Sequence, residues 1–295
     1  MRFFVTGASG WIGSATIREL LAHGHTVLGL ARSDAAAEIV TGLGAEVLRG
    51  DLDDLASLRT GAAAAEGVIH LGYVHDFTRM QDAARTDRGA IETLGEVLVE
   101  TGNPLLIASG TLGLNPGSVG TEDDHPDLTV HPRTTNAAVA LQLADSGVRS
   151  IVARFAPTVH GAGDHGFIAT LVGVAREKGV SAYIEAGENR WPAVHRSDAA
   201  DLVRRAVELA PAGSVVHAVA EEGITSRTIA ETIGEGLGLP VVSIPAGEAT
   251  EHFGWIGNFF AADAPASSDK TRAMLDWHPT GPTLVEDLRA GRYFA

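Results

Sequence analysis

The chain has 295 residues, of which 45% are hydrophobic and 20% are charged, a composition that suits a packed core and argues against disorder. It contains no cysteine, so disulfides, thiolate nucleophiles, cysteine-ligated zinc and iron–sulfur clusters are excluded. The formal net charge of −15 disfavours nucleic-acid binding, because a polyanion needs a surface rich in lysine and arginine.

The N-terminal residues predict a strand. Residues 1–5 carry one positive charge and a short apolar run that enters a glycine-rich turn, which is not typical of a signal peptide. No apolar run approaches the ~20 residues that a membrane helix needs. We therefore expect a cytoplasmic protein that does not bind membranes.

The first half of the chain alternates short apolar runs with segments long enough for crossover helices, such as 10–23 and 89–101. The runs are short, apolar and largely continuous rather than alternating, which is typical of strands buried on both faces of a parallel sheet. The predicted strands are 3–6, 26–31, 46–49, 67–71, 105–108 and 150–155. This alternation predicts an α/β fold with a doubly wound parallel sheet of the Rossmann type.

The pattern changes after residue 155. Helical spacing is found in 168–175 and 202–209, and residues 214–219 predict another buried strand. A further helix is predicted at 228–237, and Thr283 with Glu286 resembles a capping box. We predict one main domain of residues 1–160 and 193–222, and a small discontinuous C-terminal lobe of residues 161–192 and 223–295.

The clearest motif is Thr6-Gly7-Ala8-Ser9-Gly10-Trp11-Ile12-Gly13, which follows a predicted strand and opens a predicted helix. Gly7 permits the tight turn, Gly10 lets the backbone approach a pyrophosphate, and Gly13 allows close packing of helix and strand. Free amides and the helix dipole favour an anion there. The motif predicts a dinucleotide site made by Gly7, Ser9, Gly10, Trp11, Ile12 and Gly13.

The end of the second predicted strand bears on which dinucleotide is bound. An acidic residue at this point normally holds the ribose 2′-hydroxyl of NAD, whereas an arginine accommodates the 2′-phosphate of NADP. Arg32 follows this strand, with the Ser33 hydroxyl beside it, and a guanidinium can bond a phosphate with two hydrogen bonds. These residues favour NADP. NAD is the alternative, because Asp34 is an acidic residue close to the same position.

Further segments follow the glycine turn in a known order: Gly50-Asp51-Leu52, then Val68-Ile69-His70-Leu71-Gly72, then Ala153-Arg154-Phe155-Ala156-Pro157-Thr158-Val159-His160-Gly161, then Val194-His195-Arg196-Ser197-Asp198. In this order, about residues 1–220 resemble the extended or atypical short-chain dehydrogenase/reductases, whose members include nucleotide-sugar epimerases and dihydroflavonol-type reductases. The resemblance implies that Asp51 and Leu52 contact the adenine. It places Leu71 and Gly72 under the ribose and pyrophosphate, Pro157 near the nicotinamide, and Tyr73 in the cofactor site.

The chain departs from this family where the catalytic pair is expected. The family uses a Tyr-x-x-x-Lys pair on one helix face, in which the tyrosine exchanges a proton with the substrate and the lysine lowers its pKa. Counting back from Arg154 puts the pair near residues 132 and 136, where the chain has Pro132 and Asn136. Asn136 is able to hydrogen-bond the nicotinamide ribose in place of the lysine, without its charge.

Other residues are candidates to supply the missing proton. Ser109 and Thr111 end the fifth predicted strand, and the sequence does not separate them. His131 lies beside the missing tyrosine, and His160 takes the place of a tyrosine in the segment after the sixth strand. Tyr73, after the fourth strand, is a further candidate. For each of these residues, bonding to local backbone is the alternative.

The histidines and four aromatic residues are further candidates for a functional role. The twelve histidines lack the short spacing of metal ligands, so no metal site is predicted. Trp191, Trp255, Phe259 and Phe260 either form an apolar substrate wall or pack in the core.

Taken together, these features predict an NADP-dependent oxidoreductase of the atypical short-chain type, which transfers hydride to a small or medium apolar carbonyl or imine compound. The main domain holds the dinucleotide, and the lobe, which contributes to the site of the small-molecule substrate, closes over the cofactor. A non-catalytic NADP-binding sensor is the alternative. A sugar-nucleotide epimerase or dehydratase is less favoured, because its chemistry depends most on the missing pair. Both a monomer and a homodimer fit the sequence.

Overall fold

The fold is built on one parallel sheet. The structure, a computed structural model, describes residues 1–74, 79–115, 117–126 and 132–294. Seven strands pair in the order β10-β6-β5-β4-β1-β2-β3, and all neighbours are parallel. The strands are β1 (Arg2–Thr6), β2 (Thr26–Ala31), β3 (Glu46–Arg49), β4 (Gly67–His70), β5 (Pro104–Gly110), β6 (Arg149–Phe155) and β10 (Ser214–Ala218). The predicted doubly wound α/β fold is confirmed, and the predicted strands match these within a few residues.

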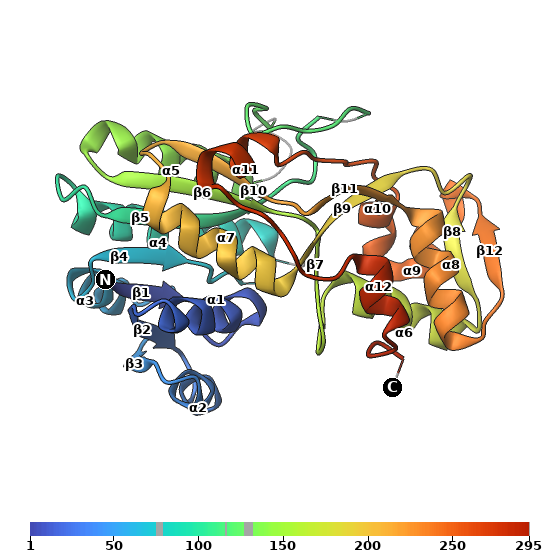
Figure 1. The fold of residues 1–295 in the computed structure, drawn as a ribbon, viewed down its shortest axis with the longest axis horizontal. Coiled ribbons are helices and arrows are strands. Elements are labelled where there is room, and N and C mark those ends of the chain that lie inside the picture. The colour runs from blue at the N-terminus through green and yellow to red at the C-terminus, as the bar shows by residue number, and fades with distance from the viewer. Residues whose placement is uncertain (75–78, 116, 127–131, 295) are drawn as a thin grey trace.

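Helices cover both faces of the sheet (Figure 1). One face carries α1 (Trp11–Ala22), α2 (Asp34–Gly42) and α7 (Arg196–Leu209), and the other carries α3 (Leu55–Ala63), α4 (Met80–Leu98) and α5 (Pro132–Gln142), which η1 (Leu143–Ser146) follows. Successive side chains of a strand point to opposite faces, so Phe3 and Val5 enter the first core and Phe4 the second. This two-sided burial explains why the strand sequences are largely apolar without alternation.

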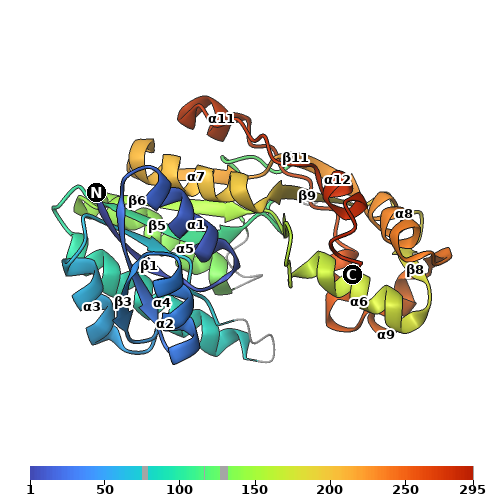
Figure 2. The same ribbon diagram turned by 60° about the horizontal axis from the view of Figure 1, so that its bottom comes forward.

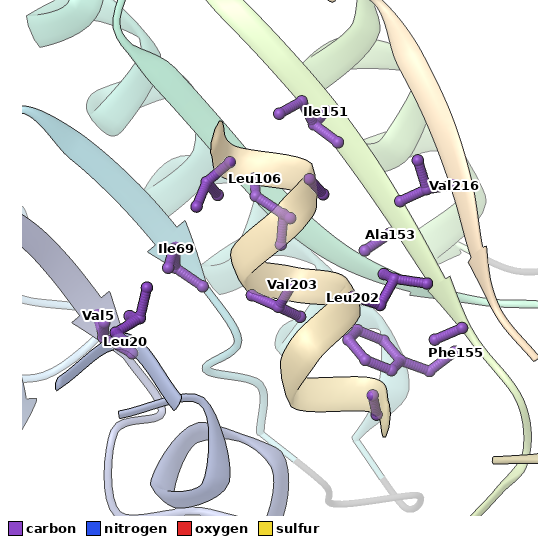
Figure 3. Packing of buried hydrophobic residues seen from close by; sticks show 14 of the residues in the cluster. Val5, Leu20, Ile69, Leu106, Ile151, Ala153, Phe155, Leu202, Val203 and Val216 are labelled. Carbon is purple, nitrogen blue, oxygen red and sulfur yellow. The ribbon is translucent and has the colours of Figure 1, made fainter. Parts of the chain in front are cut away.

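The first core lies between α7 and the sheet. Figure 3 shows Leu202 and Val203 of α7 packed over Leu106, Ile151 and Val216 of three neighbouring strands. All five side chains are fully buried. Each such burial contributes roughly 1.5–3 kcal/mol, so this face fixes α7 firmly on the sheet.

A smaller lobe stands beside the sheet (Figures 1 and 2). It contains α6 (Phe167–Lys178), β8 (Ser181–Ile184), α8 (Ser226–Leu237), β12 (Val241–Ile244), η2 (Ala246–Glu248), α9 (Ala249–Phe253), η3 (Gly254–Ile256), α10 (Gly257–Phe260) and α12 (Leu284–Arg289). A separate apolar cluster forms its core. The predicted capping box at α12 is confirmed, because Thr283 N donates to Glu286 Oε2 at 2.8 Å and Glu286 N donates to Thr283 Oγ1 at 3.3 Å.

A three-stranded sheet joins the lobe to the main sheet. Its order is β11 (Glu221–Thr225), β9 (Arg190–His195) and β7 (Thr158–His160), and β9 leads directly into α7. A later segment returns to the main core: α11 (Asp269–Leu275) contacts α7 and β10, and Trp277 is fully buried there. The boundary predicted at residue 223 assigns this segment to the lobe. No helix within the described residues is long and apolar enough to cross a membrane.

Candidate functional site

A cleft of about 820 Å³ lies where the parallel strands end. The loops that follow β1, β2, β3, β4, β5 and β6 all line it, and the lobe closes its far side with residues 164–168, Thr170 and Trp255. Strand order reverses between β1 and β4, and open α/β sheets bind ligands at the carboxyl ends of the strands beside such a reversal. The topology therefore places this cleft where a ligand is expected.

The glycine turn forms one wall of the cleft. Gly7 has a φ of +65°, and a Cβ atom there would lie 2.7 Å from the backbone nitrogen of Gly72. A Cβ atom on Gly13 would lie 2.1 Å from the Gly7 carbonyl oxygen. Both positions therefore require glycine, as the motif predicts.

The start of α1 fits an anionic diphosphate. Gly10 is the residue before the helix, and no side chain of the described residues caps this end. The first amides of a helix have no partner within it, so they are left to bind a group outside it. Ser9, Gly10, Trp11, Ile12 and Gly13 all line the cleft. The residues present thus fit the diphosphate of a dinucleotide.

Trp11 fastens this turn to the other parts of the protein. Its Nε1 donates to the Val159 carbonyl of β7 at 2.8 Å. The guanidinium of Arg196, at the start of α7, stacks 3.9 Å from the indole ring and donates to the Trp11 carbonyl at 2.6 Å. The glycine turn is therefore held by both the bridging sheet and α7.

At the tip of β2 only some of the predicted residues face the cleft. Arg32 lines it and is exposed. Ser33 caps α2, its Oγ accepting from Ala36 N at 3.2 Å, and it is not among the lining residues. Asp34 accepts from Arg49 Nη2 at 2.8 Å. The arginine is therefore presented to the cleft, while the acidic group is paired.

The middle of the cleft contains the residues that the family resemblance placed there. Asp51, Leu52, Leu71, Gly72, Tyr73 and Pro157 all line it. The Asp51 carboxylate also accepts from the amides of Asp53 and Asp54, each at 2.9 Å, which fixes the loop after β3.

Unpartnered hydroxyls mark the inner end of the cleft. Ser109 and Thr111 both line it, and the Thr111 side chain is buried with no hydrogen-bond partner for Oγ1 among the described residues. Thr158 has the same properties, although no role was predicted for it within the segment 153–161. A buried hydroxyl without a partner is uncommon and indicates that a ligand or water bonds it.

The comparisons agree with this geometry. A model of the NAD dependent epimerase/dehydratase family matches residues 3–219. The chain belongs to this family. It is 48% identical over 295 residues to uncharacterized protein C2A9.02 of Schizosaccharomyces pombe, with 100% of both chains covered. It is 26% identical to the 4-hydroxy-2-methyl-3-oxo-4-farnesyl-3,4-dihydroquinoline-1-oxide ketoreductase of Stigmatella aurantiaca, covering 90% of this chain and 84% of that one.

Among solved structures, the UDP-glucose 4-epimerase of Thermus thermophilus in complex with NAD has the same fold. Its TM-score is 0.76 at 18% identity, and 100% of each chain is covered. The family match and this likeness confirm the predicted membership and the NAD(P)-binding type of Rossmann fold.

Two residues considered for family roles lie outside the cleft. Asn136 is buried, and its Nδ2 donates to the Ala84 carbonyl at 2.8 Å and to Asp87 Oδ2 at 2.7 Å. Burial opposes the charge on Asp87, but its hydrogen bond with His70 holds the pKa of that carboxyl below its usual range. The side chain of Asn136 thus points toward α4. It does not line the cleft, where the resemblance implied that it bonds the nicotinamide ribose in place of the family's lysine.

His160 is the second such residue. It is fully buried, and its Nδ1 lies 3.0 Å from Asp287 Oδ2. Burial lowers the pKa of His160, which favours the neutral ring. His160 is not among the residues that line the cleft. His131, the other histidine considered, lies outside the described residues.

The lobe contributes an aromatic surface to the cleft. Phe167 and Trp255 line it, with ring centroids 5.6 Å apart. Of the four aromatic residues named from the sequence, Trp191 and Phe260 are each 1% exposed and belong to the core. Phe259 packs against Phe167 and Trp255 from behind. Among the described residues no cluster of side chains is suited to hold a metal ion.

Arg133 was not identified from the sequence. It is the second residue of α5, it lines the cleft, and its Nη2 donates to the Ala108 carbonyl of β5 at 3.2 Å. Its guanidinium stacks on the ring of Tyr73. The contact joins residues that are 60 positions apart, so sequence spacing gives no signal for it.

Proposed function

We propose that the protein is an NADP-dependent oxidoreductase that reduces a small or medium apolar carbonyl or imine compound. The observation that carries the proposal is the continuity of one cleft, which runs from Arg32, past the uncapped start of α1, to the unpartnered hydroxyl of Thr111. The division into a cofactor domain and a substrate lobe is part of this proposal, with residues 266–277 moved to the cofactor domain.

Each part of the cofactor has residues suited to hold it. The amides at the start of α1 would bind the diphosphate, and Asp51 and Leu52, which line the cleft, would contact the adenine. Leu71 and Gly72 would hold the ribose and diphosphate, and Pro157 would contact the nicotinamide. When bound, the reduced cofactor supplies a hydride to the substrate carbon.

The choice of NADP rests on charge at the tip of β2. Arg32 faces the cleft and offers a guanidinium to a 2′-phosphate. The rival acid, Asp34, is paired with Arg49 and is not among the lining residues. An unpaired carboxylate here would bond the ribose hydroxyl of NAD, whereas this one is paired with Arg49.

An apolar substrate suits the lobe. Among the described residues that line the cleft, the lobe contributes Asp164, His165, Gly166, Phe167, Ile168, Thr170 and Trp255, and neither lysine nor arginine. A sugar nucleotide would bring its own diphosphate in addition to that of the cofactor. A diphosphate needs positive charge or free backbone amides to bind it. The ketoreductase relative supports reduction of a carbonyl group. Thr111 and Ser109 then hold the substrate oxygen at the end of β5.

Turnover tests the proposal. The purified protein is incubated with NADPH and a panel of aromatic and aliphatic ketones, aldehydes and cyclic imines, and oxidation of NADPH is followed by absorbance. We expect reduction of at least one apolar class, and a large loss of rate in Thr111→Val. Tight NADPH binding with no oxidation across the panel would instead support the non-catalytic sensor.

A further inference from the structure

Tyr73 and Arg133 form a stacked pair inside the cleft. The guanidinium carbon of Arg133 lies 4.1 Å from the centroid of the Tyr73 ring. Tyr73 lies in the loop after β4, and Arg133 is in the first turn of α5. Both line the cleft together with Ser109 and Thr111. A phenol and a cation are therefore held together where the substrate is expected.

The surroundings of Arg133 fix its position. Its Nη2 donates to the Ala108 carbonyl, one residue before Ser109, so the guanidinium is tied to the end of β5. The negative charge of Asp87 attracts it from α4, and Asp87 is itself held by His70 and Asn136. This buried network explains why Asn136 turns away from the cleft: it orients the carboxylate that faces Arg133.

The other two tyrosines lie away from the cleft. The chain has three in all. The hydroxyl of Tyr293 donates to Asp164 Oδ2 at 2.9 Å and accepts from Gly161 N at 3.2 Å. Tyr183 lies in β8 of the lobe under Arg227, with 4.8 Å from the guanidinium carbon to the ring centroid. Neither of these two lines the cleft.

We propose that Tyr73 is the proton donor of the reaction and that Arg133 stabilises its phenolate. This inference rests on the proposed reductase function. As two-electron reduction places negative charge on the substrate oxygen or imine nitrogen, the O–H bond of Tyr73 breaks and a new O–H or N–H bond forms on the product. The phenolate that remains regains a proton from water. In the family's usual pair a lysine lowers the pKa of the tyrosine. Here Arg133 has this role, and its guanidinium lies over the face of the Tyr73 ring.

The electrostatics of the pair agree with its geometry. Burial raises the pKa of Tyr73, while Arg133 opposes this rise and Asp87 adds to it. A tyrosine at neutral pH is in the phenol form, which is the form that donates a proton, and the cation beside the ring opposes the cost of forming the phenolate in the cleft.

Variants of the pair test the inference by rate and by spectroscopy. Tyr73→Phe keeps the ring under Arg133 and removes the proton. We expect kcat for reduction to fall by about 10²–10⁴-fold, with little change in the Kd for NADPH. We expect Arg133→Met to lower kcat by about tenfold and Arg133→Lys to restore part of it. The matched control is Tyr183→Phe, which removes the hydroxyl of the tyrosine that stacks with Arg227, and it should leave kcat unchanged.

Titration of the free protein gives a readout that does not need turnover. Tyrosinate absorbance is followed against pH in wild type, Tyr73→Phe and Arg133→Met. We expect Tyr73→Phe to remove one ionisation and Arg133→Met to move that same ionisation to higher pH. If Tyr73→Phe keeps full kcat, or Arg133→Met leaves the ionisation unmoved, the inference is wrong. If wild type binds NADPH but reduces no compound, the proposed function itself fails.

Discussion

Arg49 donates a hydrogen bond from Nη2 to the Asp34 carboxylate at 2.8 Å and a second from Nη1 to the Ser33 carbonyl at 2.6 Å. The pair joins the end of β3 to the start of α2, beside the position of Arg32. It is largely exposed, so its contribution to folding is small. We expect it to matter for binding, because it pairs the carboxylate that lies two positions after Arg32 with a cation.

The first prediction concerns Arg32. We expect Arg32→Ala to raise the Kd for NADPH by about 10- to 100-fold, because a charge-assisted hydrogen bond is lost, and to change the Kd for NADH little. Fluorescence titration of each reduced nucleotide measures this. Arg59→Ala is the control, since Arg59 pairs with Glu96 on the surface of α3 and α4. Equal losses for both nucleotides would refute the NADP assignment.

Arg49 should affect the same choice indirectly. In Arg49→Ala the Asp34 carboxylate loses its partner, so we expect NADPH to bind about threefold more weakly and NADH no more weakly than before. Adding Asp34→Asn to this variant should restore the NADPH affinity, because the repelling charge is gone. A double variant that binds NADPH as poorly as Arg49→Ala would show that Asp34 plays no part.

Gly13 tests the close packing of the turn. A Cβ atom there would lie 2.1 Å from the Gly7 carbonyl, so Gly13→Ala must displace either the turn or α1. We expect loss of nucleotide binding and a lower Tm. Gly173→Ala is the matched control: Gly173 lies in α6, is exposed, and has no atom within 4 Å of its Cβ position. It should keep binding and gain up to about 1 kcal/mol from better helix propensity. Normal binding by Gly13→Ala would contradict the geometry.

His160 predicts a pH dependence of stability. Burial lowers the pKa of His160 in the folded protein, so below its unfolded value the unfolded chain binds more protons. This group therefore reduces stability as pH falls from 7 to 5, by up to about 1.4 kcal/mol per pH unit. Burial raises the pKa of Asp164 and of Glu221, which acts in the opposite direction. Comparison with a variant is therefore needed.

The measurement is urea unfolding of wild type and His160→Gln at pH 7 and pH 5. We expect any advantage of wild type over the variant to shrink at the lower pH. In wild type, His160 stays neutral in the folded protein but gains a proton in the unfolded chain, which favours unfolding. The variant lacks this group. A constant difference at both pH values would show that His160 titrates alike in the folded and unfolded chains.

The sheet could be predicted because most of its strands, those between the two edges above all, are buried on both faces. Phe3, Phe4 and Val5 are all apolar, since alternate residues enter two different cores. The strands of the lobe and of the bridging sheet were missed. β9 contains Arg190 and Pro192, and β11 is largely exposed, so neither gives a continuous apolar signal.

The site was predictable in part for a similar reason. Gly7 and Gly13 are demanded by backbone geometry, which a short motif records. No short motif records which side of α5 lies toward the cleft. The chain aligns Asn136 with a catalytic lysine, but packing between α4 and α5 turns Asn136 to Asp87 and brings Arg133 to the cleft. Contacts of this kind depend on segments far apart in the sequence.

Capture of a dinucleotide by the amides at the start of α1 underlies every function considered for this cleft. Calorimetric titration of the protein with NADPH and with NADH tests it most directly. We expect saturable heat with one nucleotide bound per chain, and a lower Kd for NADPH than for NADH. Absence of binding heat and of any rise in Tm with either nucleotide would contradict this capture.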